Sequence, residues 1–306
     1  MQRAGVLLPA VTEHALRSPI RQRLLSPFGD EGSILFQHSV MCQTSMPYRD
    51  PGNGVLAWER SNGRVGVLIT AGSAYSPRGE WVQLGLPFGP KPRLVLYHLN
   101  AEALRRQSPV IELEDSLTAF VGRTLGLDPM GRNIRIVKDQ LSRLAAADFR
   151  YGMGQGGLSV TIKGSVIDGF ELWTPKDEKQ RVLWPTTIRF SRRYFDSLMR
   201  HAVPLEEGAV TRLSHSGMGL DVYTRLAQRL HRVDPAKPAL VPWVALKKQF
   251  GSGYGRMDNF KRVFRTTLHQ VLVVYPAAKF SLDSRGMLLF NSAPPVQKKL
   301  FPVRGC

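Results

Sequence analysis

Arginine and lysine side chains gather on one face of a segment near the carboxyl end of the chain. Lys261, Arg262 and Arg265 lie outside an apolar stripe with i, i+3, i+4, i+7 spacing, so residues 256–275 are expected to form a helix with a basic outer face. Arginine can donate paired hydrogen bonds to guanine in the major groove of DNA, whereas lysine mainly supplies charge near phosphate. This pattern predicts a helix that reads DNA.

A hairpin is expected directly after this helix. Two short apolar runs flank Asp-Ser-Arg-Gly at residues 283–286, a composition typical of a tight turn. Lys279 and Arg285 belong to this hairpin, and Arg256 precedes the helix. A basic helix followed by a hairpin is the outline of a winged helix, in which the hairpin, or wing, contacts the DNA backbone or minor groove.

The same order occurs about 127 residues earlier in the chain. A helix is expected at residues 131–147, followed by strands at 158–162 and 166–173, and residues 152–157 are interpreted as a flexible joint between helix and wing. The basic residues expected on the outer face of this helix are Arg132, Arg135, Lys138 and Arg143. The protein is therefore expected to carry two DNA-reading modules in tandem.

Each basic helix needs further elements to position it. In the first module Pro90 opens a helix, residues 110–112 are extended, and a second helix begins with Asp115 or Ser116 as its cap. The second module repeats this order, and Pro242 opens its second helix where proline is best tolerated. Helix, short strand, helix, basic helix and hairpin is the order of a winged helix.

The first helix of the second module departs from this pattern. It is expected to begin at Ser214, but Gly217 and Gly219 then fall in its first turns. Each glycine disfavours a helix by about 1 kcal/mol relative to alanine, so a later start or a bend is expected.

The chain is thus predicted to be an α+β protein with two tandem winged-helix domains and β-hairpin wings. An additional hairpin is expected around Ser61-Asn62-Gly63, because Asn-Gly between apolar alternations favours a hairpin turn. The expected divisions are a basic, poorly ordered leader at 1–32, an N-terminal winged-helix domain with the extra hairpin at 33–175, a connecting segment at 176–213, and a C-terminal winged-helix domain with a basic tail at 214–306.

Charge and composition favour a nucleic-acid partner. The 306 residues carry a net charge of +18, and the isoelectric point is near 10.4, which favours a polyanion as the binding partner. The longest apolar runs, such as residues 5–11, are far shorter than the roughly 20 residues that span a bilayer. Cys42 and Cys306 lie far apart and suggest no disulfide framework, which favours a reducing, cytoplasmic compartment.

The sequence contains no convincing catalytic motif. Residues 152–157 satisfy G-x-G-x-x-G, but a helix precedes them and strands follow, the reverse of a dinucleotide-binding unit. The seven histidines form no closely spaced metal-binding pair. Glu112, Glu114 and Asp115 cluster near a helix start, where carboxylates favour the helix dipole. We therefore expect no enzyme, no cofactor and no bound metal.

Several separated motifs resemble bacterial plasmid-encoded RepA-type replication initiators. They are GLPFGPKPRL at residues 85–94, QSPVIELEDS at 107–116, GRNI at 131–134, RHAVPL at 200–205, LAQRLHR at 226–232 and YGRMD at 254–258. The resemblance covers roughly residues 84–300 and says little about the first 50 residues.

This resemblance implies an initiator that binds repeated sequences in double-stranded plasmid origin DNA and helps to open the duplex. It also implies recruitment of the host initiator and helicase, and a homodimer formed through the first module. A winged-helix transcriptional regulator is the alternative interpretation, and a DNA-processing enzyme with an unrecognised metal site is the third.

Overall fold

The computed structural model describes residues 33–52, 54–63, 65–76, 79–155, 158–169 and 187–296. The expected leader at 1–32, the end of one expected wing strand at 170–173, and the tail from residue 297 lie outside these residues. Helices and small antiparallel sheets alternate along the described chain, so the protein belongs to the α+β class, as predicted.

The first of two related units, called here the first unit, is built from helices α2 to α4 and a three-stranded sheet. Its elements are α2 (Pro90–Arg106), β6 (Val110–Glu112), α3 (Leu117–Ala119) continuing into a π-helix (Phe120–Thr124), α4 (Gly131–Ala146), β9 (Ile167–Gly169) and β10 (Thr187–Phe190). Pro90 opens α2, and the hydroxyl of Ser116 caps α3 by accepting a hydrogen bond from the Ala119 amide at 3.1 Å. The strand order is β6-β10-β9.

The second unit repeats this arrangement. Its elements are α7 (Gly217–Arg229) with a short 3-10 turn (Leu230–Arg232), β12 (Ala239–Pro242), α8 (Trp243–Phe250), α9 (Met257–Val274), β13 (Phe280–Leu282) and β14 (Gly286–Leu289). The strand order is β12-β14-β13. In both units the last strand therefore lies in the middle of the sheet. Strand β10 lies between β6 and β9, and β14 lies between β12 and β13.

Helix α7 begins later than expected. Its cap is Ser216, whose hydroxyl accepts a hydrogen bond from the Gly219 amide at 3.0 Å, so the helix starts at Gly217 and not at Ser214. Close packing explains glycine at this position, because a Cβ atom on Gly217 would lie only 3.2 Å from Cδ1 of Tyr48.

Helices α4 and α9 bury matching positions when they are aligned at the offset of 127 residues. The corresponding buried pairs are Val137 and Phe264, Gln140 and Thr267, Leu141 and Leu268, and Leu144 and Val271. The repeat predicted for these two helices is therefore present in the way they pack.

A four-stranded antiparallel sheet combines two strands that precede α2 with two strands that lie between α4 and β9 in the chain. Its strands, in spatial order, are β2 (Ala57–Asn62), β3 (Val65–Thr70), β7 (Asp148–Gln155) and β8 (Leu158–Ser165). Strands β2 and β3 form the additional hairpin that Asn62-Gly63 predicts, with Gly63 at φ +60°.

Strand β7 corrects one sequence interpretation. Gly152 and Gly154, read as part of a flexible joint, lie within β7, where Gly152 pairs with Gly66 of β3. That reading is wrong because the glycine-rich run is flanked on both sides by strands that supply its backbone with hydrogen-bond partners. Accordingly, β8 (Leu158–Ser165) pairs with β7, and β9, the described part of the other expected wing strand, pairs with β10.

The stretch expected to connect the two units, residues 176–213, holds elements that pair with earlier strands. Strand β10 completes the sheet of the first unit, and β11 (Ala202–Glu206) pairs antiparallel with β1 (Ile34–His38). Helix α5 (Arg192–His201) lies between β10 and β11 in the chain, and α6 (Glu207–Arg212) follows β11.

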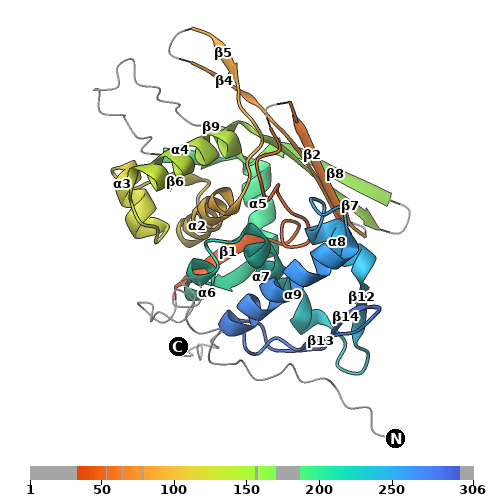
Figure 1. Ribbon diagram of the computed structural model, residues 1–306. Coiled ribbons are helices and arrows are strands. Elements are labelled where there is room, and N and C mark those ends of the chain that lie inside the picture. Colours follow the sequence, from red (N-terminus) through yellow and green to blue (C-terminus); the bar gives the residue numbers. More distant parts are fainter. Residues whose placement is uncertain are drawn as a thin grey trace, which may run out of the picture.

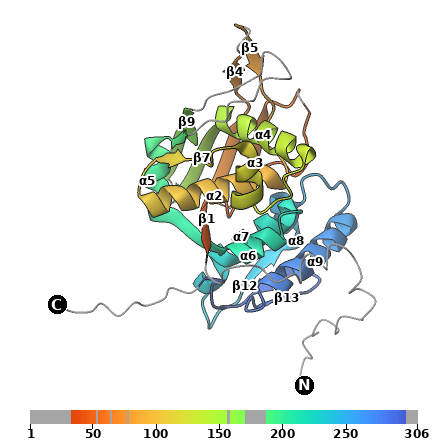
Figure 2. The same ribbon diagram turned by 90° about the vertical axis from the view of Figure 1, so that its left-hand side faces the viewer.

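The two units lie one above the other (Figures 1 and 2). Helices α2 and α4 lie above α7 and α9 in both views, and a hairpin of β4 (Ser73–Tyr75) and β5 (Trp81–Gln83) projects away from them. Buried apolar side chains of both units form one continuous core. None of the helices in the described part of the chain has the length and apolar character needed to cross a membrane.

Candidate nucleic-acid interface

The basic residues of the second unit lie on the outer face of α9. Arg262 and Arg265 are exposed, and Lys261 beside them is half-buried. The opposite face is buried in the core through Phe260 and Phe264. Helix α9 therefore presents positively charged side chains to solvent while its apolar stripe anchors it.

Trp243, the first residue of α8, joins α9 to the turn of the β13–β14 hairpin. The Nζ atom of Lys261 lies 5.0 Å from the centre of the indole ring, and Cζ of Arg265 lies 5.7 Å from it, both within cation–π range. The indole Nε1 donates a hydrogen bond to the carbonyl oxygen of Asp283 at 2.9 Å. One buried side chain thus orients two basic residues of the helix and the tip of the hairpin.

Trp243 is not among the residues predicted for the interface. A signal was present, because a tryptophan at the first position of a core-facing helix has an indole N–H that must find an acceptor when the ring is buried. The acceptor, the carbonyl of Asp283, could not be identified without the fold.

The hairpin turn is held by the carboxylate of Asp283. Its Oδ1 accepts hydrogen bonds from the amides of Arg285 at 2.8 Å and Gly286 at 3.0 Å, and its Oδ2 pairs with Nη2 of Arg285 at 3.1 Å. The hydrogen bond from Gly286, followed by those from Arg285, lowers the pKa of Asp283. The side chain of Arg285 remains 70% exposed, so its position is defined while it stays accessible.

Two other predicted residues lie at the ends of α9. Arg256 is the residue before the helix and pairs with Asp258 at 2.6 Å, with both side chains largely exposed. Lys279 is exposed just before β13. The structure therefore places Lys261 and Arg265 at the Trp243 ring, and the carbonyl oxygen of Arg285 accepts a hydrogen bond from the Trp243 amide at 3.1 Å. Arg256 and Lys279 lie beyond the two ends of α9.

A small notch opens between α9 and β13. Its volume is about 280 Å³, and Arg265 and His269 form its polar edge. The remaining walls are the apolar side chains of Leu268, Leu272, Phe280 and Leu282. Such a notch can accept a small apolar group beside an arginine.

In the first unit the predicted basic residues have different environments. Arg132 and Arg135 on α4 are exposed, and Arg135 occupies the position that corresponds to Arg262. Lys138, which corresponds to Arg265, is half-buried, and burial lowers its pKa.

Arg143 is held within the fold. Its side chain is only 15% exposed and forms an ion pair with Asp139, Nε to Oδ2, at 3.0 Å. Its Nη1 donates to the carbonyl of Leu86 at 3.5 Å, and its guanidinium lies 5.3 Å from the centre of the Phe88 ring. These contacts attach α4 to the residues that precede α2.

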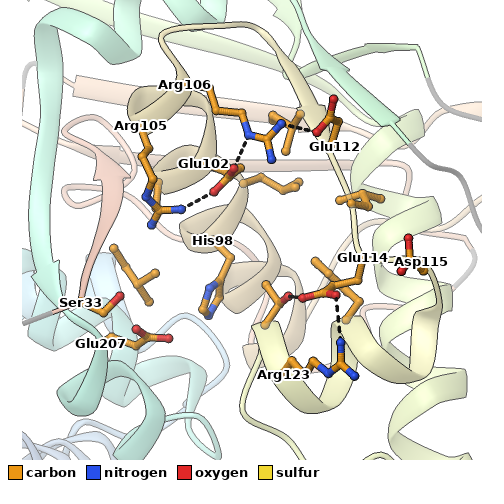
Figure 3. Close-up of a pocket in the computed structure, with 17 residues that line it drawn as sticks. Ser33, His98, Glu102, Arg105, Arg106, Glu112, Glu114, Asp115, Arg123 and Glu207 are labelled. Carbon is orange, nitrogen blue, oxygen red and sulfur yellow. Dashed lines mark hydrogen bonds and ion pairs between the residues drawn. The ribbon is translucent and has the colours of Figure 1, made fainter. Parts of the chain in front are cut away.

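Glu112 and Glu114, near the start of α3, pair with neighbouring arginines in the lining of a pocket of about 510 Å³ (Figure 3). Glu112 pairs with Arg106, which also pairs with Glu102, and these hydrogen bonds raise the pKa of Arg106. Glu114 lies 3.8 Å from Arg123. Within the described residues, no group of three or more histidine, cysteine, aspartate or glutamate side chains is arranged to hold a metal ion.

The fold and its exposed basic helices define an α+β protein with two related units and a strongly positive overall charge. Residues 86–243 match the family described as plasmid encoded RepA protein, and this match spans more than half of the chain. The protein belongs to that family, which supports a role in replication initiation. The match runs from just before α2 to the first residue of α8, so α9 and its hairpin lie beyond it.

The fold also resembles crystal structures of RctB. A selenomethionine derivative of domains 2 and 3 of RctB has a TM-score of 0.50 at 10% identity, covering 85% of this chain and 99% of that one. A second structure of domains 2 and 3 has a TM-score of 0.47 at 10% identity, covering 82% and 94%. At this identity the first likeness shows a shared fold. The comparison with curated protein sequences gave no match.

Proposed function

We propose that this protein initiates plasmid replication by binding repeated sequences in double-stranded origin DNA. Family membership supports the initiator role, and the net charge of +18 suits a polyanionic partner. DNA binding is supported above all by the repetition of a basic helix in both units. Helices α4 and α9 bear exposed arginines over matching buried positions, and each belongs to a unit with the same strand order.

In this proposal each unit acts as a winged helix, with α4 and α9 entering the major groove. The β13–β14 hairpin is the wing of the second unit. Strands β9 and β10 hold the corresponding places in the sheet of the first unit, so they take the wing's role there. Strands β7 and β8 are then an insertion between the reading helix and its wing.

Some of the basic residues are suited to recognising bases, and the others to contacting the phosphates of the DNA backbone. Arginine suits paired recognition of guanine, and the exposed candidates for this role are Arg132, Arg135, Arg262 and Arg265. Phosphate contacts fix the orientation of the protein on DNA, and we assign them to Lys138, Lys261, Arg256, Lys279 and Arg285. Arg143 takes neither role, because Asp139, Leu86 and Phe88 already engage its guanidinium.

Binding through two linked units also suits the later steps of initiation. A protein that holds two segments of duplex can supply part of the energy that bends or opens the DNA between them. We propose that the bound protein then recruits the host initiator and helicase, acts in the cytoplasm without a catalytic centre or cofactor of its own, and forms a homodimer.

An origin-dependence assay tests this proposal. Footprinting first identifies the repeats bound in the DNA that flanks the gene, and those repeats are placed on a plasmid that lacks any other origin. Replication is expected only when the protein is supplied, and it should be lost with the variant R262A/R265A. If the protein binds the repeats but the plasmid replicates without it, the initiator role is wrong and a transcriptional regulator is favoured. Metal-dependent nicking of supercoiled DNA by the pure protein contradicts a non-enzymatic role.

A further inference from the structure

A buried ion pair joins the two units. Arg93 belongs to α2 and Asp221 to α7, the first helices of the respective units. Arg93 Nε lies 2.7 Å from Asp221 Oδ1, and Nη2 lies 2.8 Å from Oδ2. The side chains are 1% and 6% exposed. This two-point geometry defines both the distance and the angle between the groups.

Further hydrogen bonds fix the guanidinium of Arg93. Its Nη2 donates to the carbonyl of Met46 at 2.7 Å, and its Nη1 donates to the carbonyls of Gly89 at 2.6 Å and Pro47 at 3.3 Å. Every nitrogen of the guanidinium therefore has a partner. The position of the pair is set from α2, from α7, and from the segment that follows β1.

On one side, short contacts connect this pair to α4. The chain directly before α2 is attached to α4, because the Phe88 amide donates to Oε1 of Gln140 at 2.7 Å. Arg143 of α4 contacts the same stretch through the Leu86 carbonyl and the Phe88 ring. Helix α4 also packs directly against α2, the helix that carries Arg93.

On the other side, the pair connects to α9. Helix α7 packs along α9, and the hydroxyl of Thr267 in α9 lies 3.6 Å from Sδ of Met218 in α7. The segment after β1 also touches α8, since the hydroxyl of Ser45 donates to the carbonyl of Gln249 at 3.2 Å. One route of direct contacts from α4 to α9 thus passes through Arg93 and Asp221.

We infer that Arg93 and Asp221 are positioning residues that fix the separation and rotational phase between the two DNA-reading helices, α4 and α9. Apolar contacts between the units are non-directional, whereas a two-point ion pair permits one relative orientation. Both side chains are buried, so neither residue contacts DNA. The inference rests on the proposed function, because it concerns how two readers are held for one DNA site.

The experiment compares DNA sites with altered spacing. The unaltered full-length protein selects a duplex from a random-sequence pool, and footprinting defines the two protected segments. About five base pairs, roughly half a helical turn, are then inserted between these segments. The unaltered protein should lose about 100-fold in affinity, since the insertion removes one set of contacts. The variant R93M/D221N should bind the original site more weakly but lose less than about 10-fold on insertion, because its readers can reorient.

A matched variant controls for the change of composition. R192M/D196N makes the same substitutions in the exposed i,i+4 pair of α5 and should keep the 100-fold spacing penalty. If R93M/D221N does not unfold cooperatively, R93K, which keeps the charge but loses the two-point geometry, takes its place and should also show a reduced penalty.

The failures of the two proposals are distinguishable. If the pool yields no duplex bound more tightly than random DNA, the proposed function is wrong. If a preferred duplex is found but the positioning variant keeps the full spacing penalty, the positioning role is overturned while DNA recognition stands. An unaltered protein whose affinity does not depend on spacing also overturns the positioning role.

Discussion

Arg265 connects two features of the candidate interface, since it lies over Trp243 and at the edge of the notch beside β13. An arginine oriented in this way is suited to reading one base, with the notch beside it open to the methyl group of a neighbouring thymine. Arg265→Ala should therefore cost about 1–3 kcal/mol on the selected site and much less on random DNA. Fluorescence anisotropy with both duplexes measures the difference.

Arg192→Ala is the control for this substitution, because Arg192 is an exposed arginine of α5 outside the candidate interface. It should leave the ratio of specific to random affinity unchanged. Equal losses on both duplexes for Arg265→Ala make that residue a phosphate contact.

His38 is a buried histidine held in its neutral form. The Val40 amide donates to its Nδ1 at 3.2 Å, so the remaining proton is on Nε2, which lies 2.9 Å from the hydroxyl of Ser197. The rings of Tyr151 and Tyr194 stack near it. Burial, and secondarily the nearby His201, lowers the pKa of His38 to about 4.

This pKa predicts how stability depends on pH. In the unfolded chain His38 has a pKa of about 6.5, so between pH 6.5 and 4 the unfolded state binds more protons than the folded state. The free energy of unfolding should fall as the pH drops through this window, by about 3 kcal/mol from His38. Urea unfolding at pH 7, 5.5 and 4.5 measures the loss.

His38→Gln should reduce this pH dependence but not abolish it, because burial also lowers the pKa of His98 to about 4. His269→Gln is the control, since His269 is exposed on α9. A His38 variant with the full pH dependence of the unaltered protein contradicts the assignment.

At the scale of elements, the helices and local hairpins could be predicted because their signals are local. The spacing of apolar residues predicts which faces of α4 and α9 are buried, and Asn62-Gly63 predicts the turn between β2 and β3. Strand β7 could not be predicted, because its glycine-rich sequence becomes a strand only between β3 and β8. The same limit applies to Arg143 in the candidate site. Its position on the helix suggested exposure, while residues about 57 positions away contact it.

The β12–β14 pairing offers an element-scale prediction. A Cβ atom on Gly286 would lie 2.1 Å from the carbonyl oxygen of Val241 and 2.8 Å from Cα of Pro242. Gly286→Ala should therefore push the two strands apart and destabilise the protein by about 1–3 kcal/mol. It should also weaken DNA binding, since the same turn accepts the hydrogen bond of Trp243.

Gly253→Ala is the matched control, because no atom lies within 4 Å of a Cβ at that position. Thermal unfolding of both variants decides the matter. Equal stabilities would show that the strands can separate without cost.

For the whole molecule, the excess positive charge should make DNA binding strongly dependent on salt. Each phosphate contact contributes a slope of about −0.9 in a plot of log affinity against log salt concentration. Lys279→Ala should make this slope shallower by about one unit and weaken binding to all sequences alike. Arg262→Ala should instead change specificity with little effect on the slope. An unchanged slope for Lys279→Ala removes that lysine from the phosphate contacts.

The pairing of β1 with β11 has a consequence for how the protein is made. Ile34 lies opposite Glu206, which follows the last strand of the first unit, so the first described strand cannot find its partner until the whole of the first unit has been synthesised. Until then Leu35, which is buried in the finished fold, and the hydrogen-bonding groups of β1 lack their native cover. Most of the chain must therefore have emerged from the ribosome before this strand is paired. A nascent chain that stalls before Ala202 presents an unpaired strand to other chains.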